Sequence, residues 1–127
     1  METCWILDDQ YGEKIYKEIR YLFPDWEYPV KKNIKTPLEF VDEIKDWDII
    51  LLDNYFPWKW WEEALGDIFL KELMQKKKKV RIVCISDYGE KLLEMYDNWE
   101  TAYKHWYIIG FVKSKDWFEI GELFLYK

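Results

Sequence analysis

Residues 48–57 read DIILLDNYFP, a short apolar run followed by an acid and, four residues later, a proline. The four apolar residues 49–52 are typical of a buried β-strand, and the run ends abruptly at Asp53. Aspartate is a good turn residue, so its carboxylate could simply mark the end of the strand. The alternative is that Asp53 lies at the carboxyl edge of a parallel sheet, where α/β folds place their functional groups.

Strand-like and helix-like segments alternate on both sides of this run. We expect further strands at residues 4–9, 28–34, 80–86 and 107–112, of which 28–34 is weak and typical of a sheet edge. Helical spacing of apolar residues predicts helices near residues 10–22, 36–47, 59–77, 89–105 and 115–126. Five strands alternating with five helices predict an α/β fold, a doubly wound five-stranded parallel sheet with helices on both faces.

Length and composition limit the functions that this chain can have. Its 127 residues suit a single domain over 1–127, and 50% of them are apolar, which is enough for a core without disulfides. The net charge of −6 argues against direct nucleic-acid binding. No apolar run approaches the roughly 20 residues of a membrane span. We interpret Cys4 and Cys84 as reduced core residues and expect a cytoplasmic protein.

Polar residues follow several of the predicted strands. Asp8 and Asp9 end the first, Asp53 ends the third, Ser86 ends the fourth, and the fifth runs into Lys113. Three carboxylates at one edge repel one another unless a cation compensates, and hard oxygen ligands suit Mg²⁺. A lysine ammonium and a hydroxyl nearby could hold phosphoryl oxygens. The pattern predicts a Mg²⁺-assisted phosphoryl site with a carboxylate nucleophile.

The order of DD, LLDNYFP, CIS and FVK resembles the receiver domain of two-component response regulators over essentially the whole chain. The resemblance implies a flavodoxin-like, receiver-type fold. It also implies that Asp53 is the phosphoacceptor, and that the donor is a sensor histidine kinase or a phosphotransfer protein. Lys113 would contact the phosphoryl oxygens, with Lys115 as a rival, and Ser86 would be the switch hydroxyl.

The same resemblance implies a set of Mg²⁺ ligands. Asp9 would bind the ion directly and Asp8 mostly through water, while Asp53 and the backbone carbonyl of Tyr55 would complete the protein ligands. The chain would assist its own phosphorylation without separate substrate turnover, so we do not expect an enzyme in the usual sense. We expect a stand-alone receiver that acts through a downstream protein partner or a homodimer, with no nucleic acid and no membrane.

Several residues depart from the receiver pattern and motivate an alternative. Asp87 follows the switch hydroxyl where a small residue is usual, Gly110 stands where an aromatic is expected, and Ser114 replaces a proline. The alternative is a receiver-like protein-interaction module that is not phosphorylated. A flavin-binding protein is a weaker third possibility, because DDQYGE after the first strand is not a phosphate-binding loop.

Basic and aromatic clusters allow two interpretations each. The block Lys76–Lys79 either complements the end of a helix or forms a phosphate or partner site, and His105 is expected to cap a helix. The motif WKWW at 58–61 either plugs the sheet edge or is a docking surface. The helical aromatic residues are expected to be core or a partner surface; they are Tyr96, Trp99, Tyr103 and Trp106.

Overall fold

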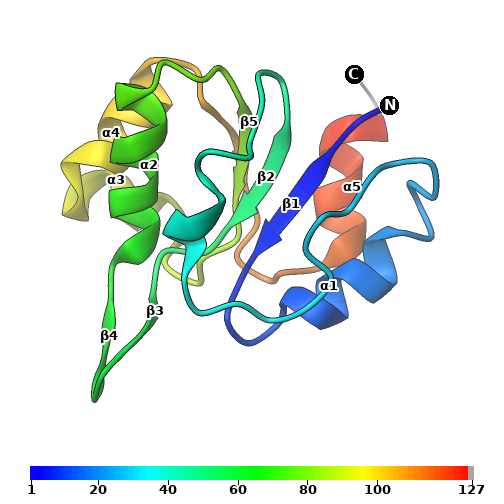
Figure 1. Ribbon diagram of the computed structural model, residues 1–127, viewed down its shortest axis with the longest axis horizontal. Helices are drawn as coiled ribbons and strands as arrows, with labels where there is room; N and C mark the ends of the chain where they lie inside the picture. Colours follow the sequence, from blue (N-terminus) through cyan, green and yellow to red (C-terminus); the bar gives the residue numbers. More distant parts are fainter. Residues whose placement is uncertain (126–127) are drawn as a thin grey trace.

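The computed structural model describes residues 1–125, and its centre is a parallel sheet (Figure 1). Within those residues the sheet has four strands in the order β1-β2-β5-β6; they are β1 (Cys4–Leu7), β2 (Ile49–Leu52), β5 (Arg81–Cys84) and β6 (Ile108–Phe111). Every pairing is parallel, and the last residues of the four strands lie side by side. The α/β parallel fold is therefore confirmed.

The expected fifth strand at residues 28–34 is absent from this sheet. Instead, an irregular segment runs beside β1, attached by one parallel bridge between Thr3 and Glu27 and by a hydrogen bond from the Ile34 amide to the Asp8 carbonyl (3.0 Å). Pro29, within this segment, has no amide hydrogen to donate, which interrupts a continuous ladder here. The apolar side chains of this segment are still buried, which explains why its sequence looks like a strand.

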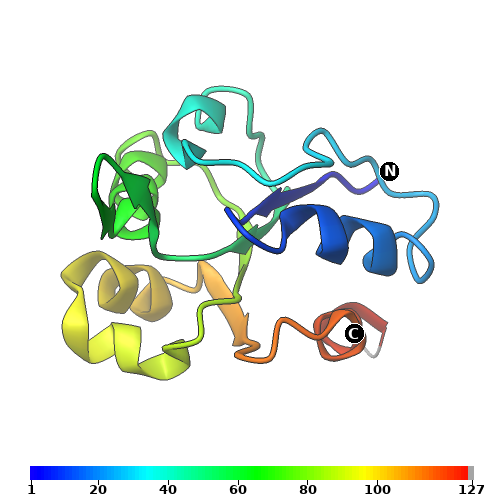
Figure 2. The ribbon, with the colours of Figure 1, turned by 90° about the horizontal axis from the view of Figure 1, so that it is seen from below.

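Helices cover both faces of the sheet (Figure 2). On one face lie α1 (Gly12–Ile19) and α5 (Trp117–Leu125), packed on alternate strand residues such as Ile6 and Leu51. On the other lie η1 (Pro37–Phe40), α2 (Leu65–Gln75), α3 (Leu92–Met95) and α4 (Asp97–Lys104), packed on the intervening residues. Strand residues alternate between two cores, as a doubly wound sheet requires. The expected last residue of the closing helix, 126, lies outside the described residues.

The helix expected at residues 36–47 is only the short 3-10 helix η1 followed by turns. The Thr36 hydroxyl donates to the Glu39 carboxylate (2.8 Å), so the two side chains of the expected capping box bond to each other and leave the backbone amides uncapped. The Lys78 ammonium donates hydrogen bonds to the backbone carbonyls of Val41 and Ile44 (2.6 Å each). In a longer helix, these carbonyls would instead accept from backbone amides of the helix.

The helix expected at residues 59–77 begins later, because a hairpin precedes it. Strands β3 (Phe56–Trp58) and β4 (Trp61–Glu63) pair antiparallel around Lys59, whose backbone is left-handed (φ 56°). The hairpin projects from the body of the protein (Figure 1), and Trp60 is 93% exposed. The interpretation that these tryptophans plug the sheet edge is therefore wrong for Trp60.

The helix expected at residues 89–105 is divided into η2 (Gly89–Lys91), α3 and α4. Tyr96 separates α3 from α4 in an extended conformation, and its hydroxyl shares a hydrogen bond with that of Tyr55 (2.7 Å). His105 follows the last residue of α4 as expected, and its amide donates to the Thr101 carbonyl (3.0 Å). Trp99 is fully buried, which confirms the core interpretation for that member of the aromatic stripe.

Both cysteines are buried in the strands, and their thiols are free. Among residues 1–125, no helix is both long enough and apolar enough to span a bilayer.

Candidate functional site

The three carboxylates predicted to meet at the sheet edge do meet there. Asp8 and Asp9 follow β1 and Asp53 follows β2, and Leu7 pairs with Leu52 at the ends of these strands. One oxygen from each carboxylate lies within 4.8 Å of the other two. The strand register therefore assembles the acidic cluster of Asp8, Asp9 and Asp53.

Asp8 is fully buried, and both of its oxygens are used. Its Oδ1 accepts hydrogen bonds from the backbone amides of Gln10 and Tyr11 (2.8 Å each), just before α1 begins. Its Oδ2 accepts a charged hydrogen bond from the Lys115 ammonium (2.5 Å). Asp8 therefore orders the loop that carries Asp9 as well as contributing charge to the cluster.

Asp53 is also buried, with 9% of the residue exposed. Its Oδ1 accepts from the Asn54 amide (2.8 Å), and its Oδ2 accepts from Lys115 (3.1 Å). Burial raises the pKa of Asp53 to about 6; Lys115 opposes this shift and Asp8 adds to it. Burial, followed by the charge of Asp8, also raises the pKa of Asp9.

Lys115, not Lys113, is the lysine at this cluster. Burial disfavours the Lys115 ammonium, but the carboxylates of Asp53 and Asp8 outweigh that effect, and the pKa of Lys115 is raised. Lys115 has a left-handed backbone (φ 55°), and this turn brings it to the carboxylates. Lys113 is exposed and lies across Gly89, where a Cβ atom would be 2.4 Å from its Cε. Lys115 therefore lies at the carboxylates, where Lys113 was expected.

The remaining predicted site residues lie at the same edge. Ser86 is buried just after β5, and its hydroxyl accepts from the Tyr88 amide (3.2 Å). Tyr55 follows Asp53 by two residues, and the role of its carbonyl as a metal ligand stays a prediction. Asp87 lines a hollow of about 170 Å³ beside Lys115, and Lys14 also lines it. Sequence reasoning did not place Lys14 at this hollow, although its ammonium pairs with Glu18 (3.9 Å) and not with Asp87.

Asn54 and Gly66 hold the backbone of the phosphoacceptor candidate in place. The Asn54 side chain is fully buried, and its Oδ1 accepts from the indole of Trp99 (2.8 Å). The backbone carbonyl of Asn54 accepts a hydrogen bond from the Gly66 amide (2.9 Å) in the first turn of α2. A Cβ atom on Gly66 would lie 2.3 Å from the Asp53 carbonyl oxygen, so only glycine allows α2 to approach this closely.

Gly66→Ala is expected to lower the free energy of unfolding by about 2 kcal/mol, because backbone atoms of Asp53 and Asn54 would have to move. Gly121→Ala is the matched control, since the atoms nearest to its Cβ would belong to the side chains of Leu22 and Phe23 and not to the backbone. Urea denaturation of both variants measures the difference. Equal losses of stability in the two variants would contradict the claim that α2 is packed tightly against the site.

The donor set fits a hard divalent cation. All three groups are carboxylates, which Mg²⁺ prefers, and they converge from two strand ends. Within the described part of the chain, Asp9 is the member of the cluster that forms no ion pair. Asp9 is therefore free to bind an ion, while Lys115 already balances part of the charge of Asp8 and Asp53.

The fold is similar to that of a response regulator from Colwellia psychrerythraea, known from a crystal structure. The TM-score is 0.68, the match covers 94% of this chain and 90% of that chain, and the sequences are 18% identical. No family model matches the sequence, and a search of curated proteins gives no significant match. In its fold, this chain is a receiver-like domain.

Proposed function

We propose that this protein is a phosphoacceptor receiver of a two-component pathway, which takes a phosphoryl group on Asp53 with Mg²⁺ and signals through partner binding. One observation carries the proposal: the buried carboxylate of Asp53 contacts Lys115 and lies within 4.8 Å of Asp8 and Asp9. A strand-end acid that served only as a turn residue would have no need of two further carboxylates and a buried lysine around it.

The chain's own groups suit phosphoryl transfer to a carboxylate. An oxygen of Asp53 would attack the phosphorus of a phosphohistidine, the bond from phosphorus to nitrogen would break, and the imidazole would leave with the electron pair. Lys115 would offset the negative charge that gathers on the phosphoryl oxygens, and the Ser86 hydroxyl would donate to one of them afterwards. A bound Mg²⁺, held by Asp9 and Asp53, would neutralise further charge.

The donor in this proposal is a sensor histidine kinase or a phosphotransfer protein in the cytoplasm. The receiver is itself the substrate, because it is phosphorylated on Asp53 and later loses the phosphoryl group. No turnover of a separate substrate is expected. The output would be a protein partner or a second copy of the chain, without direct contact to nucleic acid or membrane.

A second candidate function is a protein-interaction module that is not phosphorylated. The observation in its favour is the hairpin of β3 and β4, which presents three partly or fully exposed tryptophans; they are Trp58, Trp60 and Trp61. Exposed tryptophans are favoured at protein interfaces. In this alternative, the acidic cluster would be a structural remnant and Asp53 would not react.

Intact-mass spectrometry after incubation with acetyl phosphate distinguishes the two functions. We expect a single phosphoryl adduct that requires Mg²⁺ and is lost in Asp53→Asn. Asp67→Asn is the matched control, because Asp67 is also a partly buried carboxylate of raised pKa but lies outside the acidic cluster. An unlabelled wild type, tested beside a receiver that does accept phosphate, would favour the interaction module.

A further inference from the structure

A second cavity lies at the opposite end of the sheet from the acidic cluster, where the strands begin. Its volume is about 760 Å³, which is within the range of small-molecule sites. Two tryptophans, two lysines and the only histidine contribute to its lining; they are Trp47, Trp106, Lys77, Lys79 and His105. Although the chain has 25 Asp and Glu residues, none of the described residues that line this cavity is acidic.

The two tryptophans are exposed on a fixed backbone. Trp47 is 66% exposed, yet its amide donates to the Lys79 carbonyl (2.5 Å) and its carbonyl accepts from the Arg81 guanidinium (2.9 Å). Trp106 is 87% exposed and follows α4 in a tight turn. Two exposed indoles are therefore presented at the cavity from backbone positions that hydrogen bonds hold in place.

The backbone at these positions would suit glycine better. Trp106 has a φ of 67°, and the Tyr107 amide reaches back to the Ala102 carbonyl (2.9 Å), which is the helix ending where glycine is preferred. Lys77 has a φ of 56° and ends α2 in the same way. The backbone of Trp47 is also in the left-handed conformation, with a φ of 72°. Three residues other than glycine thus keep a left-handed backbone around this cavity, and we take this as support for a role other than stability.

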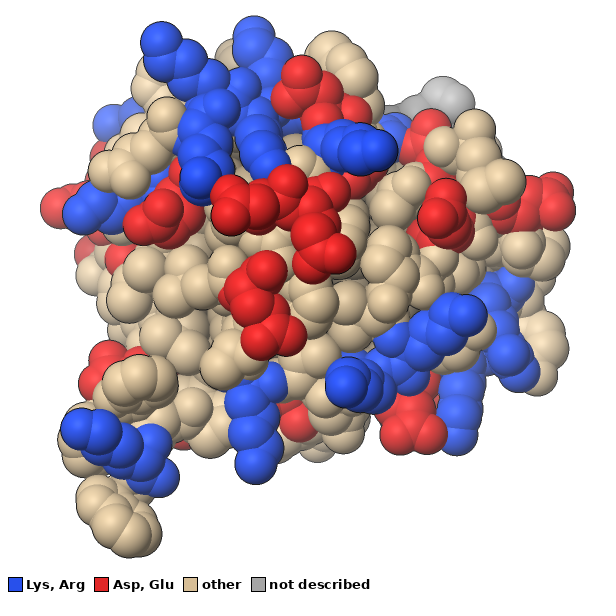
Figure 3. Space-filling view, in the orientation of Figure 1, with Lys and Arg blue, Asp and Glu red and all other residues tan. Residues whose placement is uncertain are grey.

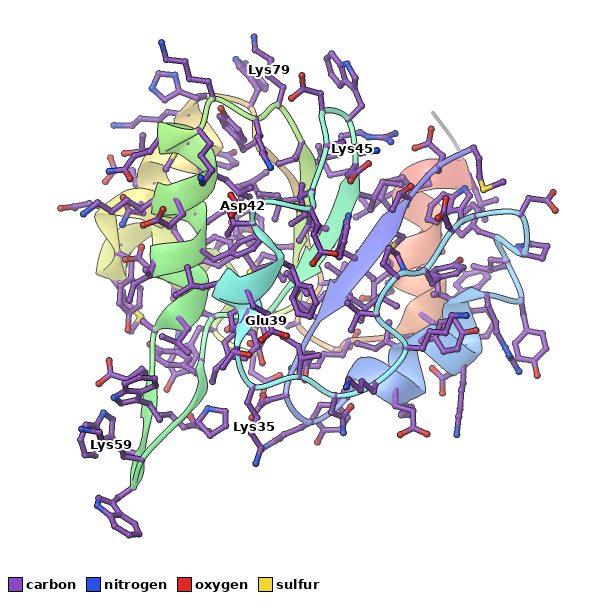
Figure 4. The ribbon with its side chains drawn as sticks, in the orientation of Figure 1. Lys35, Glu39, Asp42, Lys45, Lys59 and Lys79 are labelled. Carbon is purple, nitrogen blue, oxygen red and sulfur yellow. The ribbon has the colours of Figure 1, made fainter. Side chains whose placement is uncertain are left out.

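The basic block is divided between structure and this cavity. The Lys76 ammonium pairs with Asp42 (2.9 Å), and Lys78 donates to backbone carbonyls. Within the described part of the chain, Lys77 and Lys79 form no ion pair. Figure 3 shows Lys and Arg gathered over this end of α2, and Figure 4 places Lys79 there, far from Lys59 of the hairpin.

We propose that this cavity binds a nucleotide: a planar aromatic ring stacks on Trp106 and Trp47, and the phosphates are held by Lys77 and Lys79. Indoles stack on the faces of bases, and lysines bind phosphates as point charges. The chain as a whole has a net charge of −6, but no acidic residue lines this cavity. The lining therefore favours an anionic ligand. The larger hollow beside α1, of about 1170 Å³, also has cations and aromatics, but Glu27 and Glu39 line it and would repel phosphates.

Calorimetric titration with ADP in the presence of EDTA tests the proposal, because EDTA keeps metal away from the acidic cluster. We expect saturable binding of one ADP, at least tenfold weaker binding of adenosine and of inorganic pyrophosphate, and unchanged binding of ADP by Asp53→Asn. The last variant makes the outcome independent of the proposed phosphorylation.

Trp106→Gly should weaken ADP binding at least tenfold without lowering the melting temperature, since glycine suits the left-handed turn. Lys79→Ala should weaken ADP binding by a similar factor. Trp60→Gly is the matched control, because Trp60 is an exposed tryptophan of the hairpin, and its loss should leave the affinity for ADP unchanged. Absence of saturable ADP binding would overturn the proposal, as would equal binding by Trp106→Gly. A wild-type dimer that Trp106→Gly converts to a monomer would also overturn it, by making the patch an interface between copies.

Discussion

Lys115→Met is expected to lower the free energy of unfolding by about 3 kcal/mol at pH 8, because removal of one partner leaves buried charge uncompensated. Lys115 contacts Asp8 (2.5 Å) and Asp53 (3.1 Å), and its side chain is 11% exposed. The proposed function adds a second effect: uptake of phosphoryl groups from acetyl phosphate should slow by about 100-fold, because Lys115 offsets charge in the transition state.

Lys113→Met is the control for Lys115→Met, because Lys113 lies across Gly89 and does not contact the carboxylates. We expect this variant to keep both its stability and its labelling rate. Millimolar Mg²⁺ should restore much of the stability that Lys115→Met loses, since the cation can replace the missing ammonium. Urea denaturation of both variants with and without Mg²⁺ measures these free energies of unfolding. If Lys113→Met were the more damaging variant, the assignment of Lys115 would be wrong.

The strands with continuous apolar runs were predictable from the sequence. Residues Ile49–Leu52 and Arg81–Cys84 form the central strands where the pattern placed them, because a strand buried on both faces has few alternatives to an unbroken apolar run. The acidic cluster was predictable for the same reason. Once the strands are parallel and adjacent, the residues that follow them must share one edge.

Elements that depend on tertiary contacts were not predictable. Residues 28–34 resemble a weak edge strand, but Pro29 within them removes an amide donor from any ladder. Tyr96 interrupts an apolar helical pattern and is hydrogen-bonded to Tyr55, which is 41 residues away. The left-handed turn at Lys115 has no glycine to reveal it, so sequence reasoning gave its site role to Lys113.

Asp53→Asn is expected to be more stable than the wild type at neutral pH, by about 3 kcal/mol. The native pKa of Asp53 is raised by burial from 3.8 to about 6, and this displacement corresponds to about 3 kcal/mol. Between these two values the native state binds more protons than the unfolded state, so the wild type loses stability as the pH rises. Above pH 6 the full penalty of the charged form is present, and asparagine avoids it.

Denaturation of both proteins in EDTA from pH 4 to pH 8 measures this effect. The difference in stability should be near zero at pH 4, grow through pH 5, and become constant above the native pKa of about 6. Saturating Mg²⁺ should reduce the difference at pH 8, because the cation favours the charged carboxylate that asparagine lacks. A difference independent of pH would contradict the claim that burial of an ionised Asp53 destabilises the fold. Such a cost is expected of a group kept for reactivity, since a turn residue would be placed where water solvates it.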